Sequence, residues 1–308
     1  MIPRPDVVDY FSTTVHENNE WSPQARRHEA RQQGSETVPQ RDILVIIPTY
    51  NEAENVETAI QRVLAVLPDV DIMIVDDGSP DGTGEIVRRI SANDDRVSLM
   101  ERTGKRGLGP AYLDGFAHGM ASGHTLLIEM DADGSHPASA LPAMLAAIRS
   151  ADSVGGVIGS RWVTGGAVVD WPKSRRLISR GGSTYARVML GLKVRDVTAG
   201  FRVYKASALQ AIELETVQSQ GYCFQIDMTR RMAANGFGLV EVPITFKDRV
   251  AGTSKMSKAI VVEAMLRVTI WGFERLVGKE RGRRESRDAK RVVEQPSAVS
   301  YEKHEGWS

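Results

Sequence analysis

The sequence has little cysteine, no net charge and no long apolar run. Cys223 is the only cysteine in 308 residues, which excludes an internal disulfide framework and is typical of a reducing, cytoplasmic protein. The 39 lysines and arginines balance 39 aspartates and glutamates, so bulk charge gives no indication of nucleic-acid binding. No segment approaches the roughly 20 uninterrupted apolar residues of a membrane-spanning helix. Acidic residues interrupt any secretory signal in the first 20 residues, so we expect a cytosolic protein that meets lipid from outside the bilayer.

Composition divides the chain into three parts. Residues 1–40 are polar and lack periodicity, so we predict a disordered N-terminal arm. Residues 41–277 hold the periodic apolar segments and form the predicted domain. Residues 278–308 are charged, and we predict a disordered tail.

The first half of the domain alternates apolar runs with amphipathic segments. Four short runs predict buried strands: Ile43–Ile47, Asp71–Val75, Val97–Met100 and Thr125–Met130. Apolar residues at helical spacing lie between these runs, and the first of the helices is expected to begin at Asn51 or Glu52. This alternation predicts a three-layer α/β/α sandwich with a mostly parallel central sheet, in which ligands bind beyond the carboxyl ends of the strands.

The second half is less regular. Val154–Ile158 and Leu239–Phe246 predict two more strands, and Tyr185–Leu190 predicts a helix after a polar, basic loop at Trp171–Arg180. Ala259–Val277 predicts an amphipathic helix. This helix either packs on the core or binds anionic lipid together with the basic tail.

Carboxylates end two of the predicted strands. Asp131 and Asp133 follow the fourth strand, where hard oxygen ligands suit Mg²⁺ or Mn²⁺ bridging to a diphosphate; a turn or helix cap is the alternative. Asp76 ends the second strand and can accept N–H groups of a nucleobase, while the turn that follows offers Ser79 or Asp81 as a helix cap. The strand ends therefore predict one shared cleft.

Two basic stretches are candidates for anion binding. Arg249 and Lys255 follow a predicted strand and would fold over a diphosphate, unless they belong to a solvated loop. Arg175 and Arg180, with Ser179 between them, would hold an acceptor that is itself a phosphate, unless they only cover the end of a helix.

Five motifs occur together, in order and with matching spacing: Ile47–Glu52, Val75–Thr83, Asp131–Asp133, Gly159–Trp162 and Asp248–Lys255. Together they resemble the dolichyl- or polyprenyl-phosphate mannosyltransferases, inverting family 2 glycosyltransferases with the GT-A (Rossmann-like, nucleotide-diphospho-sugar transferase) fold. The likeness extends over about 42–271. It looks closest to the actinobacterial polyprenol monophosphomannose synthases, through Glu129–His136 and Gly221–Asp227.

The resemblance implies transfer of mannose from GDP-mannose to a polyprenyl monophosphate with inversion, at the inner face of the plasma membrane and with Mg²⁺ or Mn²⁺. It assigns the guanosine to Pro48, Tyr50, Glu52, Ile74 and Asp76. It assigns the diphosphate, metal and sugar to Asp131, Ala132, Asp133, Arg161, Arg249 and Lys255, among which Asp131 and Asp133 would bind the metal and act with Arg249 and Lys255 on the leaving group. Arg175 and Ser179 match positions that hold the lipid phosphate. Ser135 stands where some relatives have a glutamine metal ligand. In actinobacterial relatives this domain is fused to, or partnered with, a multi-spanning membrane protein, and the resemblance implies a similar partner here.

Three alternatives remain open from the sequence. A UDP-glucose-dependent polyprenyl-phosphate glucosyltransferase would share this fold and mechanism, because base and sugar choice depend on pocket shape. A non-catalytic nucleotide-binding scaffold subunit would not need the acidic pair or both basic stretches. A transferase with a soluble acceptor would need a positioned general base, and no residue is a clear candidate.

Overall fold

The computed structural model describes residues 41–219, 221–247 and 258–278 of the chain. In chain order its elements are β1 (Ile43–Thr49), α2 (Val56–Val66), β2 (Asp71–Asp76), α3 (Thr83–Ser91), β3 (Val97–Glu101), α4 (Leu108–Ala121), β4 (Leu126–Glu129), η1 (Ala138–Ala140), α5 (Leu141–Ile148), β5 (Val154–Ser160), β6 (Ala167–Val169), α6 (Lys173–Leu190), β7 (Arg202–Lys205), α7 (Ala206–Ala211), η2 (Leu214–Thr216), α8 (Tyr222–Ala234), β8 (Gly238–Pro243), β9 (Thr245–Lys247) and α9 (Lys258–Leu276). The four strands predicted in the first half are confirmed, with ends that move by one or two residues. The arm at 1–40 and the tail beyond Gly278 lie outside the described residues.

Seven strands form the central sheet, in the order β3-β2-β1-β4-β7-β5-β8. β1 pairs in parallel with β2 and β4, β2 with β3, and β5 with β8. β7 runs antiparallel to both of its neighbours, β4 and β5. The prediction of a mostly parallel sheet is therefore confirmed, and the carboxyl ends of its six parallel strands lie along one edge.

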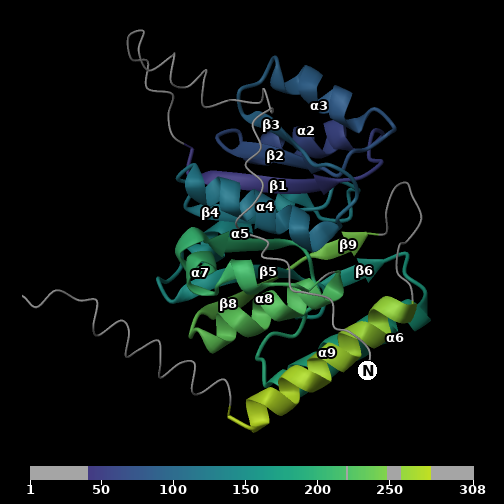
Figure 1. Ribbon diagram of the computed structural model, residues 1–308, viewed down its shortest axis with the longest axis vertical. Coiled ribbons are helices and arrows are strands. Elements are labelled where there is room, and N and C mark those ends of the chain that lie inside the picture. The colour runs from purple at the N-terminus through teal and green to yellow at the C-terminus, as the bar shows by residue number, and fades with distance from the viewer. Residues whose placement is uncertain (1–40, 220, 248–257, 279–308) are drawn as a thin grey trace, which may run out of the picture. The chain divides into compact units, whose positions relative to one another are not determined.

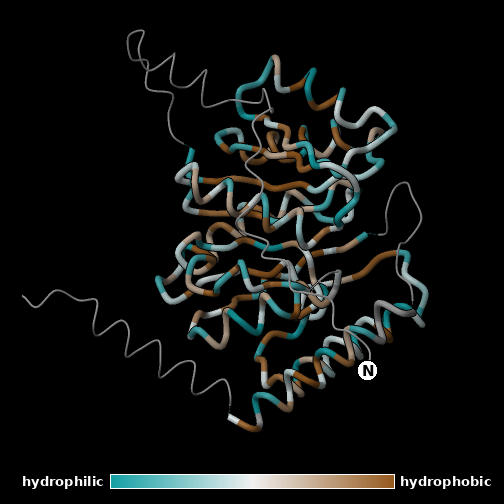
Figure 2. The backbone as a smooth tube through the Cα atoms, in the orientation of Figure 1, coloured by the Kyte–Doolittle hydropathy of each residue, from teal (hydrophilic) through white to brown (hydrophobic). Residues whose placement is uncertain are grey.

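Helices cover both faces of the sheet (Figure 1). Alternate residues of β1 point to opposite faces: Val45 and Ile47 pack with α2, α3 and α5, whereas Leu44 and Ile46 pack with α4, α7 and α8. In Figure 2, β1 is drawn mostly in the brown of hydrophobic residues, as expected for a strand buried on both faces. The predicted three-layer α/β/α arrangement is confirmed.

A third apolar cluster joins α6 and α9 to the domain. Ala186 and Leu190 of α6 pack with Val268 of α9, Ile226 of α8 and Ile158 of β5. The two helices lie side by side next to β8 and α8 (Figure 1). The predicted amphipathic helix at Ala259–Val277 is confirmed as α9. Among the helices of the described residues, none is long and apolar enough to cross a membrane.

The loop predicted at Trp171–Arg180 is wrong from its third residue onward, because α6 begins at Lys173. Pro172 directly precedes the first helical turn, where its fixed backbone angle favours helix and a missing N–H is tolerated. Ser183, Ala186 and Leu190 of α6 are buried at helical spacing, whereas its exposed side carries polar residues together with Leu177, Ile178 and Val188. A run rich in polar residues is compatible with a loop or with the exposed side of a helix, and only the buried positions distinguish the two.

Other elements also differ from prediction, and α5, β6, α7 and α8 have no counterpart among the predicted segments. The first helix begins at Val56 because Asn51 has a left-handed φ of 59° and the backbone N–H of Ala53 binds the Asp81 carboxylate. The single strand expected at Leu239–Phe246 divides at Ile244 into β8 and β9, and β9 pairs with β6 in a separate two-stranded sheet. β7 was not predicted, because four residues with a charge at each end give no strong strand signal.

Candidate active site

The residues predicted to hold the guanosine lie beyond the ends of β1 and β2. Pro48 pairs with Val75 in the parallel register of these strands, and Tyr50 follows directly after β1. The ammonium group of Lys105 lies 4.2 Å from the centre of the half-buried Tyr50 ring. Glu52 accepts a hydrogen bond from the Asn55 side chain at 2.8 Å. The structure thus brings these side chains to the carboxyl edge of the sheet.

Asp76 is buried and takes part in a local network. Its Oδ1 accepts hydrogen bonds from the hydroxyl groups of Thr49 (2.7 Å) and Ser79 (2.6 Å), and its Oδ2 accepts the backbone N–H of Ser79 at 2.8 Å. Ser79 therefore binds Asp76, and it is Asp81 that accepts the first backbone N–H of α3 at 3.1 Å. Ile74 is fully buried in the core. Nucleobase contacts of Ile74 and Asp76 stay predictions.

Asp77 is a structural residue of this edge that the sequence did not single out. Its Oδ2 accepts the backbone N–H groups of Arg106 and Gly107, each at 3.0 Å, and so fixes the glycine-rich turn before α4. The guanidinium of Arg102, just beyond β3, lies 3.2 Å from Asp77 and 3.2 Å from Asp114. Burial lowers the pKa of Arg102, although both carboxylates act in the opposite direction.

The acidic pair follows β4. Asp133 is buried and accepts the backbone N–H of Ser135 at 3.0 Å, whereas the Asp131 side chain is 31% exposed and its Oδ1 accepts the Tyr112 hydroxyl at 3.2 Å. Burial, followed by the neighbouring Asp131 carboxylate, raises the pKa of Tyr112 well above its usual value, so this hydroxyl stays a hydrogen-bond donor. Ala132 is buried between the two carboxylates.

The donor set fits a hard divalent cation held mainly by its substrate. Among the described residues, no group of three or more histidine, cysteine, aspartate or glutamate side chains is arranged to hold a metal. His136 lies 3.9 Å from Asp131, but its Nδ1 accepts the Asp131 backbone N–H at 3.0 Å, so the neutral ring carries its proton on Nε2 and has no lone pair to donate there. Mg²⁺ commonly takes one or two carboxylates together with phosphate oxygens and water. Asp131 and Asp133 match that pattern.

A buried polar network lies behind the acidic pair. Glu129 is fully buried, and its Oε2 accepts a hydrogen bond from the Gln225 amide at 2.8 Å. Burial raises the pKa of Glu129 to about 8, although Arg202 acts against this. Arg202 is also fully buried, and its N–H groups bind the carbonyls of Val197 and Ala199 and the hydroxyls of Tyr204 and Thr229. Glu129 and Gln225 belong to two of the motifs that carry the family resemblance, whereas no pattern in the sequence marks Arg202.

Arg161, predicted to contact the diphosphate or sugar, makes a buried ion pair at the end of β5. Its Nε and Nη2 bind the two carboxylate oxygens of Asp196 at 2.8 and 2.7 Å, and Nη2 also binds the Thr198 hydroxyl at 3.0 Å. Asp196 is fully buried and receives the Arg161 backbone N–H at 2.9 Å as well. Its own backbone N–H binds Glu241 of β8 at 2.9 Å. This network fixes the segment between α6 and β7, and a substrate contact of Arg161 stays a prediction.

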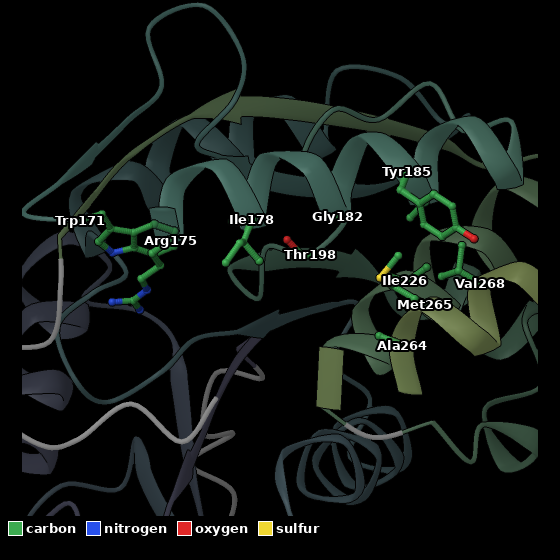
Figure 3. Close-up of a pocket in the computed structure, with 12 residues that line it drawn as sticks. Trp171, Arg175, Ile178, Gly182, Tyr185, Thr198, Ile226, Ala264, Met265 and Val268 are labelled. Atoms are coloured by element: carbon green, nitrogen blue, oxygen red, sulfur yellow. The ribbon is translucent and has the colours of Figure 1, made fainter. Parts of the chain in front are cut away.

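Arg175 and Ser179, the predicted acceptor-phosphate residues, are brought together on α6, where both line the α6–α9 pocket. This pocket has a volume of about 80 Å³, and Arg175 is the only charged residue among its described lining. Apolar side chains form most of its wall: Ile178, Ala186, Ile226, Ala264, Met265 and Val268. Figure 3 shows Arg175 and Trp171 at one end and Tyr185 and Val268 at the other. The other two predicted cations, Arg249 and Lys255, lie outside the described residues.

The family model for "Glycosyl transferase family 2" matches residues 44–213, which include β1 to β7 and both members of the acidic pair. The chain belongs to this family. It is 51% identical to the undecaprenyl-phosphate mannosyltransferase of Micrococcus luteus, over 75% of this chain and 94% of that protein. It is 48% identical to the polyprenol monophosphomannose synthase of Mycolicibacterium smegmatis, over 79% of this chain and 92% of that protein. The resemblance to actinobacterial enzymes of this type is therefore confirmed.

Solved structures of low sequence identity share the fold. The mannosyl-3-phosphoglycerate synthase of Rubrobacter xylanophilus matches with a TM-score of 0.56 and 16% identity, over 83% of this chain and 78% of that one. Glucosyl-3-phosphoglycerate synthase of Mycobacterium tuberculosis, with Mn²⁺ and UDP-glucose, matches with a TM-score of 0.52 and 18% identity, over 86% of this chain and 85% of that one. These matches confirm the GT-A fold for this family 2 member.

Proposed function

We propose that this protein transfers mannose from GDP-mannose to a polyprenyl monophosphate with inversion, forming polyprenyl-phosphate β-mannose. The observation that carries the proposal is the α6–α9 pocket, which joins an apolar wall to one cation, Arg175, among the described residues that line it. An acceptor with an isoprenoid chain and a phosphate head has the same division between apolar and anionic parts. The names of the two bacterial relatives, both about half identical to this chain, support the same substrates.

The acceptor determines what the residues must do. A phosphate monoester is already anionic near neutral pH, so its oxygen can attack the anomeric carbon without a general base. One bond forms between that oxygen and the anomeric carbon, while the bond from this carbon to the GDP oxygen breaks with inversion. Arg175 and Ser179 would orient the attacking phosphate, and this alignment of two anions is the main demand on the protein.

The leaving diphosphate needs positive charge on the opposite side of the sugar. Asp131 and Asp133 would hold a divalent cation, Mg²⁺ or Mn²⁺, which when bound offsets charge on the departing GDP. Arg249 and Lys255 are proposed to bind the same diphosphate. Tyr112 keeps the Asp131 carboxylate oriented through its hydrogen bond.

We also propose that the protein works at a membrane surface, the cytoplasmic face in particular. Beside the pocket, α6 exposes Leu177 (74%) and Ile178 (53%), and α9 exposes Leu266 (60%), Ile270 (56%) and Phe273 (60%). In Figure 2 both helices carry brown and teal segments along their length. Exposed apolar side chains around an apolar pocket would let a lipid acceptor pass from the bilayer into the site without crossing water.

The experiment uses purified protein, radiolabelled GDP-mannose, farnesyl phosphate and Mg²⁺ or Mn²⁺. We expect label in the organic phase, none of it when EDTA is present, and at least a hundredfold lower rate for Asp133→Ala. Radiolabelled UDP-glucose in place of GDP-mannose is the matched donor control, and we expect it to give no labelled lipid.

Two outcomes would contradict the proposal. Transfer from UDP-glucose but not from GDP-mannose would leave the mechanism intact and overturn the donor. No transfer from either donor, by protein that still binds the nucleotide, would indicate a scaffold subunit.

A further inference from the structure

Three aromatic side chains lie between the acidic pair and the α6–α9 pocket. The rings of Trp171 and Phe246 meet edge to face at 5.4 Å, and those of Phe246 and His136 do so at 5.8 Å. His136 in turn stacks on Phe201 at 5.1 Å. We name His136, Phe246 and Trp171 the aromatic bracket. Edge-to-face packing of this kind favours one fixed arrangement of the rings.

Each end of the aromatic bracket contacts a residue of the proposed reaction. At one end, His136 accepts the backbone N–H of Asp131 at 3.0 Å. At the other end, the guanidinium carbon of Arg175 lies 4.1 Å from the centre of the Trp171 ring. The bracket therefore links the first metal carboxylate to the acceptor-phosphate arginine through packed rings.

The middle of the bracket is held by the small sheet. Phe246 lies in β9 opposite Val168 of β6, and Trp171 follows β6 by two residues. Trp171 and Phe246 also face Arg161, whose guanidinium carbon lies 5.6 and 5.5 Å from their ring centres. Because Arg161 is itself fixed by its ion pair with Asp196, the Trp171 ring has a second guanidinium neighbour whose position is held by the fold.

We propose that Trp171 is a positioning residue for the acceptor: its ring holds the Arg175 guanidinium in the orientation that receives the phosphate. This inference rests on the proposed function. The Arg175 guanidinium carbon lies over the Trp171 ring, 4.1 Å from its centre, and the N–H groups of an arginine lie in the plane of the guanidinium. A ring that packs on the guanidinium restricts the long Arg175 side chain. The N–H groups in the guanidinium plane stay available for two parallel hydrogen bonds to phosphate oxygens.

The test measures binding, so it does not depend on turnover. Dissociation constants for farnesyl phosphate and for farnesol are measured by calorimetry with wild type, Trp171→Leu and Trp171→Phe. Trp271→Leu is the matched control, because Trp271 makes the same kind of contact with Arg230, at 4.8 Å, and is not among the described residues that line the pocket. Thermal midpoints verify that each variant is folded.

We expect Trp171→Leu to weaken farnesyl phosphate binding about tenfold, Trp171→Phe to restore most of it, and neither to change farnesol binding by more than twofold. Trp271→Leu should change neither constant. If Trp171→Leu weakens the binding of both ligands equally, the ring only shapes the pocket. If it leaves farnesyl phosphate binding unchanged, the ring does not orient Arg175. Either result overturns the inference. Wild type that binds neither ligand overturns it too. Wild type that binds farnesyl phosphate but transfers no mannose overturns the proposed function and leaves the inference standing.

Discussion

Replacing Glu129 by glutamine should remove a pH dependence from the stability of the fold. Glu129 is fully buried, Gln225 donates to its Oε2, and neither Glu129 Oε1 nor Gln225 Oε1 has a partner among the described residues. A proton on Oε1 would supply the missing donor for the amide oxygen. Burial accordingly raises the pKa of Glu129 from 4.5 to about 8. A glutamine at this position mimics the protonated form at every pH.

The size of this change in stability follows from the linkage between protonation of Glu129 and folding. A carboxyl whose pKa is higher in the folded protein stabilises it fully below pH 4.5, and this stabilisation is lost as pH rises towards about 8. One pKa unit corresponds to about 1.36 kcal/mol, so the free energy of unfolding of wild type relative to Glu129→Gln should fall by roughly 3–4 kcal/mol between pH 5 and pH 8. Above about pH 9 the difference should stay constant.

The assay is urea unfolding of both proteins from pH 5 to pH 9, with EDTA present so that no bound cation alters the carboxylates. Comparing the two proteins at each pH cancels the titration of groups that do not interact with Glu129. A difference that stays constant from pH 5 to pH 8 would refute the reasoning, because it would mean that Glu129 is ionised throughout and compensated by Arg202.

Three further results are expected. Asp196→Ala leaves the buried Arg161 guanidinium without its carboxylate and should lower the free energy of unfolding by about 3–5 kcal/mol in urea titrations; a loss below about 1 kcal/mol would contradict the buried ion pair. Ala264→Leu should fill the α6–α9 pocket and raise the KM for farnesyl phosphate at least tenfold while the KM for GDP-mannose stays within twofold; equal changes in both would place the acceptor elsewhere. Cys223 is buried and its pKa is raised to about 11, so a disulfide reagent at pH 8 should label it only after unfolding, and rapid labelling of the native protein would refute its burial.

The sequence predicted those parts of the fold that have a local signal. β1, β2 and β4 are apolar on both faces because both faces are covered, and such runs are recognisable without a structure. The antiparallel direction of β7 has no such signal in the sequence, because the direction of a four-residue strand depends on its neighbours in the sheet. The start of α6 is not predictable from the sequence. Its polar residues define an exposed side of a helix only when the buried positions are known.

The positions of the candidate site residues were likewise predictable only where the sequence carries a local signal. The position of Asp76 and Asp131 at one edge of the sheet is predictable, because strand ends in a parallel sheet share an edge. The partner of Arg161 cannot be predicted, since Asp196 lies 35 residues away along the chain. Trp171 precedes Arg175 by only four residues, but their contact depends on α6 beginning at Lys173, which the prediction of a loop at Trp171–Arg180 excludes. Interactions between distant side chains depend on the completed fold, so pairing of this kind is invisible in a single sequence.

The most direct test of the account is the structure of the product. Purified protein is incubated with GDP-mannose carrying ¹³C at the anomeric carbon, farnesyl phosphate and Mg²⁺, and the lipid fraction is examined by NMR. The account predicts a single mannosyl phosphate in the β configuration, with the anomeric carbon coupled to the phosphorus of the lipid. An α-linked product would contradict the account. So would the absence of lipid-linked mannose from folded protein that binds GDP-mannose.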